Sequence, residues 1–314
     1  MHHHCENEIN NRIFSNLTLP QKKISSTYFY DKKGSKLFEK ITKLPEYYLT
    51  RTEIPLIKQA AAYLKSDLSD VNIIESGSGD CTKISLLLNV IPEENRSSVC
   101  YTPFDVSTTS VKEACNVLLE KYDGLRIHGI IADFMTQLNT IEKKPNKLLC
   151  FLGSTIGNFT REQSKEFIQD LHNIMQKKDR LLIGFDMVKD KEILERAYND
   201  SQQLTAQFNK NILNVMNSLV DTNFIPDNFE HVAFFNENKS RIEMHLASLR
   251  NQIVDSPRFP DSIHIKKDET ILTEYSHKFT MDHISQLAEQ AQLEIEKWFS
   301  DDNNWFSLAL LRKL

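Results

Sequence analysis

Short apolar runs alternate with amphipathic stretches along residues 53–186 of this chain. The apolar runs have the length of buried strands, and the stretches between them repeat apolar residues three and four positions apart, as one face of a helix does. This alternation predicts βαβ units, and therefore a parallel sheet covered by helices on both faces. The expected elements are helices at 53–64, 83–90, 110–122 and 161–176, and strands at 72–75, 98–105, 125–133, 180–185 and one that ends at Gly153.

The end of the chain has a different pattern. Two strand-like runs, 292–300 and 305–311, are joined by Asp301-Asp302-Asn303-Asn304, which predicts an antiparallel hairpin. A Rossmann-like, mostly parallel sheet that finishes in such a hairpin is the usual outline of class I methyltransferases. On this analogy of fold we expect an α/β protein.

Two segments, 1–51 and 189–278, do not fit the alternation. The second of them contains a long helical stretch at 191–219 and an expected hairpin at 232–254. We expect these segments to form a second, α+β domain, while 52–188 and 279–314 form the Rossmann-like domain.

The composition excludes several classes of protein. The 314 residues carry a formal net charge of −5, which gives no electrostatic reason to expect a nucleic-acid partner. No apolar run approaches the ~18 residues that span a bilayer, so we expect no membrane partner. Five cysteines without CxxC spacing suit reduced thiols, and hence a cytoplasmic protein. The histidines show no HExxH or clustered spacing, so we expect no metal.

A glycine turn follows the first expected strand. In VNIIESGSGD (71–80), Gly77 and Gly79 would let the main chain approach a ligand just before a helix begins. The alternative is that the turn uses glycine for steric reasons alone. Position 82 is a threonine, so the third glycine of the GxGxxG pattern is absent, which disfavours NAD.

Acidic residues end the next two expected strands. Asp105 could accept hydrogen bonds from ribose hydroxyls. It could instead cap the following helix, although Ser107 could do so too. Asp133, in IIADF (130–134), could bind an adenine amine. With the glycine turn, these residues favour a cofactor that contains adenosine, either a dinucleotide or S-adenosylmethionine.

The segment CFLGSTIGNFT (150–160) follows the fourth strand with a loop that contains Gly153 and Gly157. This loop displays the amide of Asn158, and Thr160 is placed to cap the helix that follows. Ligands of open α/β sheets bind beyond the carboxyl ends of the strands. Asn158 is therefore a candidate substrate contact, with ordinary loop chemistry as the alternative.

These residues carry a resemblance to a known family. The chain resembles the L-histidine Nα-methyltransferases of ergothioneine biosynthesis, which use S-adenosylmethionine to convert histidine to its trimethylbetaine, hercynine. The resemblance covers nearly the whole chain in order. Its motifs are YFYDKKGSKLFEKITKLPEYYLTRTE (28–53), ESGSGDCTK (75–83), PFDVS (103–107), FLGSTIGNFT (151–160), DMVKD (186–190), AYND (197–200), FNKNIL (208–213), RIEMHL (241–246) and TEYSHKF (273–279).

The resemblance implies a role for particular residues. It implies that 52–188 and 279–314 bind S-adenosylmethionine, and that 1–51 and 189–278 bind histidine. The product would be S-adenosylhomocysteine, and the protein would act as a monomer on small molecules. The implied cofactor residues are Gly77, Gly79, Lys83, Asp105, Asp133 and Phe134. The implied substrate residues are Tyr30, Phe38, Tyr47, Gly153, Asn158, Tyr198, Met244, Glu274 and Ser276. No residue is assigned to the chemical step itself, and Asn158, Tyr30 and Tyr47 would position the reactants.

The residues also fit this chemistry directly. Transfer of a methyl group from a sulfonium needs a neutral amine held in line, and alignment can supply ~7–11 kcal/mol of the barrier. Asn158 and Tyr198 are neutral donors for a carboxylate, and add no positive charge beside a sulfonium. Glu274 and Ser276 alternate along TEYS and would face the same side of a strand, where they could bind an imidazole. Tyrosine faces favour a quaternary ammonium by ~0.5–2 kcal/mol each.

Other interpretations remain open. Tyr47, Tyr198 and Met244 could be core residues, and Glu274 could be a solvated strand residue. The chain could methylate another aromatic amino acid, such as tryptophan or a derivative, but a polar Glu274/Ser276 pair would be wasted on an apolar ring. A binder without catalysis is a third possibility, and a nicotinamide oxidoreductase is a fourth.

Overall fold

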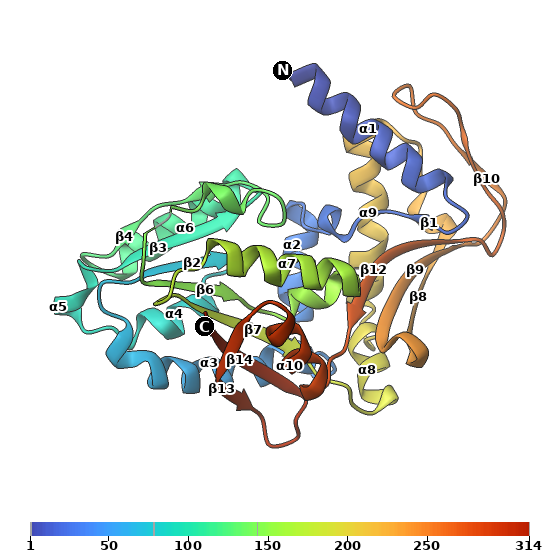
Figure 1. Cartoon of the computed structure of the whole chain (residues 1–314). Helices are drawn as coiled ribbons and strands as arrows, with labels where there is room; N and C mark the ends of the chain where they lie inside the picture. The colour runs from blue at the N-terminus through green and yellow to red at the C-terminus, as the bar shows by residue number, and fades with distance from the viewer. Residues whose placement is uncertain (1, 78, 143, 314) are drawn as a thin grey trace. The chain divides into compact units, whose positions relative to one another are not determined.

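The computed structural model describes residues 2–77, 79–142 and 144–313. The chain divides into two compact units (Figure 1). The parallel-sheet unit comprises Leu49–Val188 and Lys278–Leu314, and the antiparallel-sheet unit comprises Met1–Tyr48 and Lys189–His277. The binding roles expected for the corresponding segments remain predictions.

The parallel-sheet unit is built on one large sheet. Its strands are β2 (Asn72–Ser76), β3 (Cys100–Asp105), β4 (Arg126–Ile127), β5 (Ile130–Ile131), β6 (Lys147–Phe151), β7 (Arg180–Asp186), β13 (Leu293–Ser300) and β14 (Phe306–Lys313). In the described part of the chain they form an eight-stranded sheet in the order β13-β14-β7-β6-β2-β3-β4, with β5 beside β3 (Figure 1). β14 runs antiparallel to both β7 and β13, and the pairs that join β7, β6, β2 and β3 are parallel. The predicted α/β fold with a C-terminal antiparallel hairpin is confirmed.

Helices cover this sheet, and the loops that follow β2, β3 and β6 each end where the next helix begins. They are α3 (Tyr48–Leu64), α4 (Thr82–Leu88), α5 (Glu93–Arg96), α6 (Thr108–Lys121), α7 (Arg161–Ile174) and α10 (Met281–Gln290), with 3₁₀ turns η2 (Lys65–Asp67), η3 (Leu138–Thr140) and η4 (Thr155–Asn158). The predicted cap of α7 is confirmed, because Thr160 Oγ1 accepts from the Gln163 N–H at 3.2 Å. The Gln163 side chain accepts in return from the Thr160 N–H at 2.9 Å, which completes a capping box.

The expected third strand, 125–133, is not continuous. It consists of the short strands β4 and β5, so the prediction of one long strand is wrong. Gly129 lies between them and packs so closely on α6 that a Cβ at this position would lie 2.5 Å from Val111 Cγ1. Such close approach is one reason for glycine in a strand. β5 ends at Ile131, so Asp133 lies in the loop after it, and the expectation that Asp133 ends a strand is wrong.

The antiparallel-sheet unit has its own sheet and helices. Its helices are α1 (His2–Thr18), α2 (Lys32–Ile41), α8 (Lys191–Tyr198) and α9 (Leu204–Val220), and its 3₁₀ turns are η1 (Ser26–Phe29), η5 (Pro226–Asn228) and η6 (Glu237–Lys239). Its strands are β1 (Lys22–Lys23), β8 (Phe229–Asn236), β9 (Arg241–Ser248), β10 (Gln252–Val254), β11 (Ile263–Ile265) and β12 (Thr270–His277). Over the described residues, β1-β12-β9-β8 form a four-stranded sheet, and β10 pairs with β11. α9 packs against β8 and β9 (Figure 1).

Two expectations for this unit need correction. The helical stretch 191–219 is two helices, because the Asp200 carboxylate accepts from the Leu204 and Thr205 N–H groups at 2.9 and 2.8 Å and starts α9 anew. In the expected hairpin 232–254, β8 pairs with β9, but residues 252–254 pair with β11 instead.

A buried carboxyl group lies at the centre of the parallel sheet. Glu75, on β2, is 3% exposed and accepts a hydrogen bond from the Tyr101 hydroxyl at 2.6 Å. Burial raises the pKa of Glu75 to about 8, although the Tyr101 hydrogen bond and the charge of Lys83 oppose this shift. Glu75 is therefore mostly protonated in the folded protein at neutral pH.

We expect Glu75→Gln to stabilise the protein progressively, relative to the wild type, as the pH rises from 4.5 to about 8. In this window Glu75 ionises in the unfolded chain but stays protonated in the folded one. The wild type therefore loses up to about 1.4 kcal/mol of stability per pH unit, a loss that glutamine does not share. Urea unfolding of both proteins at several pH values across the window measures the difference. A difference that stays constant with pH would show that Glu75 is ionised when folded.

Candidate active site

The carboxyl ends of the parallel strands gather most of the predicted cofactor residues along one edge of the sheet. β2 pairs in parallel with β3 on one side and with β6 on the other. The chain connections therefore run in opposite directions on the two sides of β2. In open α/β sheets, ligands bind beyond the strand ends at such a point of reversal. The glycine turn follows β2 at this point, and the Asn158 loop follows β6.

The glycine turn has a backbone that only glycine adopts easily. Gly77 and Gly79 have φ angles of +72° and +50°. A Cβ at either position would meet nothing within 4 Å, so no steric contact requires glycine there. The turn thus presents open main chain, as expected for a ligand contact, but its positive φ angles alone also favour glycine, so the ligand role of the turn remains a prediction.

Asp105 and Asp133 do not cap helices; each accepts a hydrogen bond from the main-chain N–H two residues further along the chain. Ser107 caps α6, and Asp105 Oδ1 accepts from the Ser107 N–H at 2.8 Å, so the helix-cap alternative for Asp105 is wrong. Burial raises the pKa of Asp105, and its hydrogen bonds to the main chain oppose the shift. Asp133 Oδ1 accepts from the Met135 N–H at 2.8 Å. Each acid keeps a second carboxylate oxygen that these bonds do not use.

The side chain of Phe134 belongs to the core. It is 7% exposed and packs edge-on against Phe104, with ring centroids 4.9 Å apart, and lies parallel to the Phe151 ring at 5.9 Å. A cofactor contact at this position would therefore come from the main chain.

A buried carboxylate that sequence reasoning missed connects the two loops. Glu53, on α3, is 1% exposed. Its Oε2 lies 2.7 Å from the Lys83 ammonium, and its Oε1 accepts from the Gly153 N–H at 2.6 Å. Lys83 lies in the first turn of α4, just after the glycine turn, and Gly153 lies at the start of the Asn158 loop. Glu53 lies in the first expected helix and in the family motif 28–53, but only the tertiary structure brings it to these partners.

The Asn158 loop holds an unusual backbone. Gly153 and Ser154 are both left-handed, with φ angles of +78° and +57°. The Ser154 hydroxyl accepts from the Asp186 N–H at 2.7 Å, which ties the strained residue to the end of β7. Asn158 is the last residue of η4, and the described residues give its amide no hydrogen-bond partner. The amide is thus available to a ligand.

The predicted imidazole-binding residues Met244, Glu274 and Ser276 lie in the antiparallel-sheet unit, together with Tyr198, a predicted carboxylate contact. Glu274 on β12 pairs directly with Met244 on β9, so their side chains share one face of the sheet. The hydroxyls of Tyr198 and Ser276 lie 2.7 Å apart. Tyr198, Met244, Glu274 and Ser276 are called the β9–β12 cluster below.

Tyr30 lies close to this cluster. The residue exposes 48% of its surface. Even so, burial, the neighbouring Glu274 carboxylate and Tyr198 together raise the pKa of its hydroxyl well above the usual range. The phenol therefore stays protonated and can donate a hydrogen bond.

The predicted aromatic residues form a chain of rings. Phe38 packs edge-on against Tyr30 at 5.6 Å and against Tyr47 at 6.1 Å between centroids. Phe208, on α9, completes the chain at 5.8 Å from Tyr30 and 5.9 Å from Phe38. The sequence showed Phe208 only as part of the motif FNKNIL. Tyr48, the neighbour of Tyr47 in the sequence, is by contrast fully buried and is a core residue.

Comparison with known proteins identifies the family. Residues 9–313 match the family described as histidine-specific methyltransferase, SAM-dependent. The histidine N-alpha-methyltransferase of Mycobacterium tuberculosis is 35% identical over 302 residues, which cover 96% of this chain and 94% of that protein. This chain belongs to the histidine-specific, S-adenosylmethionine-dependent methyltransferases. The enzyme of the same name from Mycolicibacterium smegmatis is 36% identical, over 95% of this chain and 92% of that protein.

More distant proteins share the architecture of this methyltransferase. The 4-dimethylallyltryptophan N-methyltransferase of Claviceps purpurea is 27% identical, over 88% of this chain and 86% of that protein. A crystal structure of an S-adenosylmethionine-dependent methyltransferase from Clostridium acetobutylicum superposes with a TM-score of 0.51 at 10% identity, over 88% of this chain and 98% of that one. At such identity the likeness concerns the fold alone.

The described residues contain neither a cluster of metal ligands nor a helix suited to span a bilayer. No group of three or more His, Cys, Asp or Glu residues gathers as metal ligands within 2–77, 79–142 and 144–313. Over the same ranges, no helix combines the length and apolar character that a bilayer span requires.

We expect Glu53→Ala to destabilise this methyltransferase by about 1–3 kcal/mol, because it leaves the Gly153 N–H and the Lys83 ammonium without their buried partner. Glu53→Gln should cost less, since the amide oxygen can still accept from Gly153. Urea unfolding of the three proteins measures both effects. Equal losses for the two variants would show that the Gly153 hydrogen bond contributes nothing.

Proposed function

We propose that this methyltransferase transfers methyl groups from S-adenosylmethionine to the α-amine of L-histidine. The product would be the trimethylbetaine hercynine, formed in the first step of ergothioneine biosynthesis. The family and the 35–36% identity to the mycobacterial histidine N-alpha-methyltransferases support this proposal. The observation that carries it is the β9–β12 cluster, in which a carboxylate and two hydroxyls share one face with a thioether.

The donor belongs to the parallel-sheet unit in this proposal. When bound, S-adenosylmethionine supplies a methyl group on a positively charged sulfur, and S-adenosylhomocysteine is left. Gly77 and Gly79 fit this ligand because their positive φ angles leave open main chain at the end of β2. Asp105 would accept hydrogen bonds from the ribose hydroxyls, and Asp133 would accept one from the adenine amine. Each would use its Oδ2 atom, because Oδ1 already accepts from a main-chain N–H.

The histidine carboxylate would be held by neutral groups. The amide of Asn158 and the hydroxyl of Tyr198 can each donate a hydrogen bond, and the main chain at Gly153 would lie close by. Neither donor brings a positive charge, so neither opposes the sulfonium or the ammonium that forms. The Tyr198 and Ser276 hydroxyls can reverse which of them donates, so Tyr198 can turn its proton toward the ligand.

The imidazole would be recognised by three members of the β9–β12 cluster. Glu274 accepts from a ring N–H, Ser276 donates or accepts at the other nitrogen, and Met244 packs on the ring. The rings of Tyr30, Phe38 and Tyr47 would surround the amine. A fully methylated nitrogen is a quaternary cation, which aromatic faces stabilise by about 0.5–2 kcal/mol each. No side chain is assigned as the base that removes the amine protons.

A single incubation tests the proposal. The purified protein is mixed with S-adenosylmethionine and, separately, with histidine, its mono- and dimethylated forms, and tryptophan, and the products are identified by mass spectrometry. We expect successive mass gains of one, two and three methyl groups on histidine and none on tryptophan. Methylation of tryptophan with histidine untouched would assign this chain the kind of substrate named for its Claviceps relative.

We expect Glu274→Ala to raise the KM for histidine by about 100-fold or more, because a buried ring N–H loses a charged acceptor. Binding of S-adenosylhomocysteine, measured by calorimetry, should change by less than about twofold, since Glu274 lies outside the donor unit.

Asn158→Ala is the matched control for this prediction. It should impair every amino-acid substrate alike, because all of them share the carboxylate. Unchanged histidine turnover in Glu274→Ala would remove the proposed role of this residue.

A further inference from the structure

A buried polar network lies next to the β9–β12 cluster. Its side chains have no proposed ligand contact, and the network reaches the cluster through the main-chain oxygen of Tyr198. Its centre is Asn209 on α9, which is fully buried. The Asn209 amide nitrogen donates to the main-chain oxygen of His245 at 3.0 Å and lies 2.8 Å from His231 Nδ1. The amide oxygen accepts from the Thr273 hydroxyl at 2.6 Å. One side chain thus joins α9 to β8, β9 and β12.

The partners of Asn209 and His231 fix where the protons of these two side chains lie. The His245 carbonyl can only accept, so the amide nitrogen of Asn209 must point toward it. His231 Nδ1 then accepts the second amide proton, and His231 Nε2 carries the ring proton, which it donates to the main-chain oxygen of Tyr198 at 2.9 Å. Burial lowers the pKa of His231, in agreement with a neutral ring. The network therefore also holds the end of α8, where Tyr198 is the last residue.

Thr273 occupies a β-bulge. Leu272 pairs with His245 and Glu274 pairs with Met244, so Thr273 is an extra residue on β12 with no partner of its own on β9. The Thr273 hydroxyl lies 2.6 Å from the Asn209 oxygen and 3.0 Å from the main-chain oxygen of Met244. Both oxygens can only accept, and the hydroxyl has a single proton, so Thr273 donates it to the nearer oxygen, that of Asn209. The side chain of the bulged residue is thus hydrogen-bonded to α9.

The bulge decides which side chains join Met244. Without the extra residue, the pairing would continue from Leu272/His245 so that Thr273 faced Met244 and Glu274 faced Glu243. A shift of one residue turns every following side chain to the opposite face. Glu274 and Ser276 would then leave the face that carries Met244.

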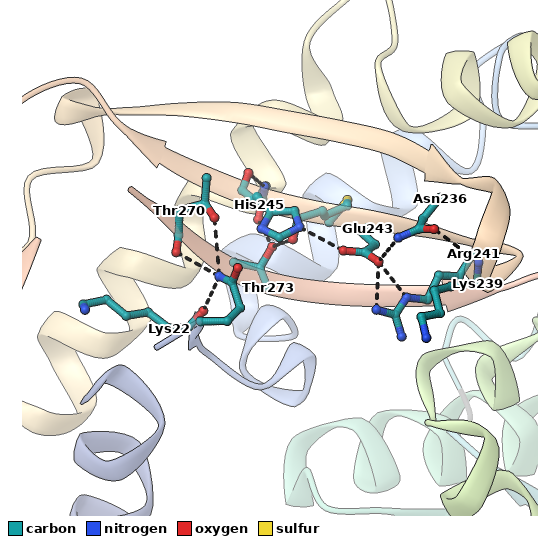
Figure 2. Close-up of polar contacts among 11 residues, drawn as sticks. Lys22, Asn236, Lys239, Arg241, Glu243, His245, Thr270 and Thr273 are labelled. Atoms are coloured by element: carbon teal, nitrogen blue, oxygen red, sulfur yellow. Dashed lines mark hydrogen bonds and ion pairs between the residues drawn. The ribbon is translucent and has the colours of Figure 1, made fainter. Parts of the chain in front are cut away.

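The opposite face of β9 is already occupied. Figure 2 shows the Glu243 carboxylate there, in contact with Asn236, Arg241 and His245. In the unbulged register the Glu274 carboxylate would lie directly across from Glu243, and like charges in that position are destabilising. The bulge keeps the two carboxylates on different faces.

We propose that Asn209 and Thr273 are positioning residues for histidine recognition. Their hydrogen bond holds the bulge that turns Glu274 and Ser276 toward Met244. Through His231, the same amide fixes Tyr198. The inference rests on the proposed function, and it adds to it the residues that set the specificity of the β9–β12 cluster without contacting the ligand.

The neighbours of Asn209 on α9 support this role for the helix. Phe208 packs on the rings of Tyr30 and Phe38. The Asn211 amide donates at 2.8 Å to Asp31 Oδ1, which also caps α2, the helix that carries Phe38. Adjacent residues of α9 thus support both the aromatic chain and the β9–β12 cluster.

Thr273→Val tests the inference, because it removes the hydroxyl and keeps the branched shape. We expect the KM for histidine to rise about tenfold or more, and the KM for S-adenosylmethionine to stay within about twofold. Thr273→Ser keeps the hydroxyl and should stay within about threefold of the wild type in both. Calorimetric titration of histidine into protein saturated with S-adenosylhomocysteine should show the same order of affinities.

Asn217→Ala is the matched control for general destabilisation. Asn217 lies on the same helix and also bridges buried groups, since it accepts from the Phe224 N–H and donates to the Phe224 oxygen, but it contacts neither β9 nor β12 in these bonds. We expect it to lower the melting temperature without changing the KM for histidine. Asn209→Leu should raise the KM for histidine at least as much as Thr273→Val, and the double variant should be no worse than Asn209→Leu alone, because that variant already lacks the hydrogen bond to Thr273. If Asn209→Leu does not fold, the Val/Ser pair at Thr273 still decides.

The possible failures are distinguishable. If the wild type does not methylate or bind histidine, the proposed function is wrong and the inference falls with it. If the wild type does so but Thr273→Val and Thr273→Ser behave alike, or Asn217→Ala raises the KM for histidine as much as Thr273→Val, only the inference is overturned.

Discussion

The register of β12 against β9 decides which side chains share a face with Met244, and with it the proposed contacts to the amino acid. Side chains alternate along a strand, so a single extra residue exchanges the two faces for everything that follows it. At Thr273 that extra residue brings Glu274 level with Met244 and keeps it from Glu243. A bulge costs regular pairing and must be stabilised from outside the ladder. The buried hydroxyl of Thr273 and the amide of Asn209 supply hydrogen bonds where the pairing is interrupted.

The parallel-sheet unit handles its carboxyl groups in two different ways. Glu75 is buried with one hydroxyl partner, and its raised pKa leaves it mostly neutral. Glu53 is equally buried but has an ammonium and a main-chain N–H as partners. Neither group therefore places an uncompensated charge beside the glycine turn. In the proposed function, the carboxylate partners of the donor are Asp105 at the end of β3 and Asp133 in the loop after β5.

Much of this arrangement was predictable from the sequence, for a physical reason. Parallel strands share one edge for their carboxyl ends, so locating a strand in the sequence also locates the residues that follow it. Gly77 and Gly153 were placed in this way, and the Thr160 cap followed from its position before a helix. The break between β4 and β5 was not predictable from the apolar pattern, because both short strands keep the same register against β3. Alternation predicted that Glu274 and Ser276 share a face, but it could not say that Met244 lies on the same face, since a bulge leaves no mark on the pattern.

The residues that the sequence did not reveal act through hydrogen bonds to partners that are distant in the sequence. Glu53 and Asn209 both read as ordinary helix positions, and each acquires its role only through partners that are distant in sequence: Gly153 for the first, Thr273 for the second. Each joins a helix to the start of a segment that carries proposed ligand contacts. The two hydrogen-bond networks share no residue and belong to different units. On the proposed roles, a substitution in the Asn209 network can therefore alter recognition of the amino-acid side chain while the proposed donor-binding loops keep their structure. In such a fold, substrate specificity can diverge while the donor chemistry is retained.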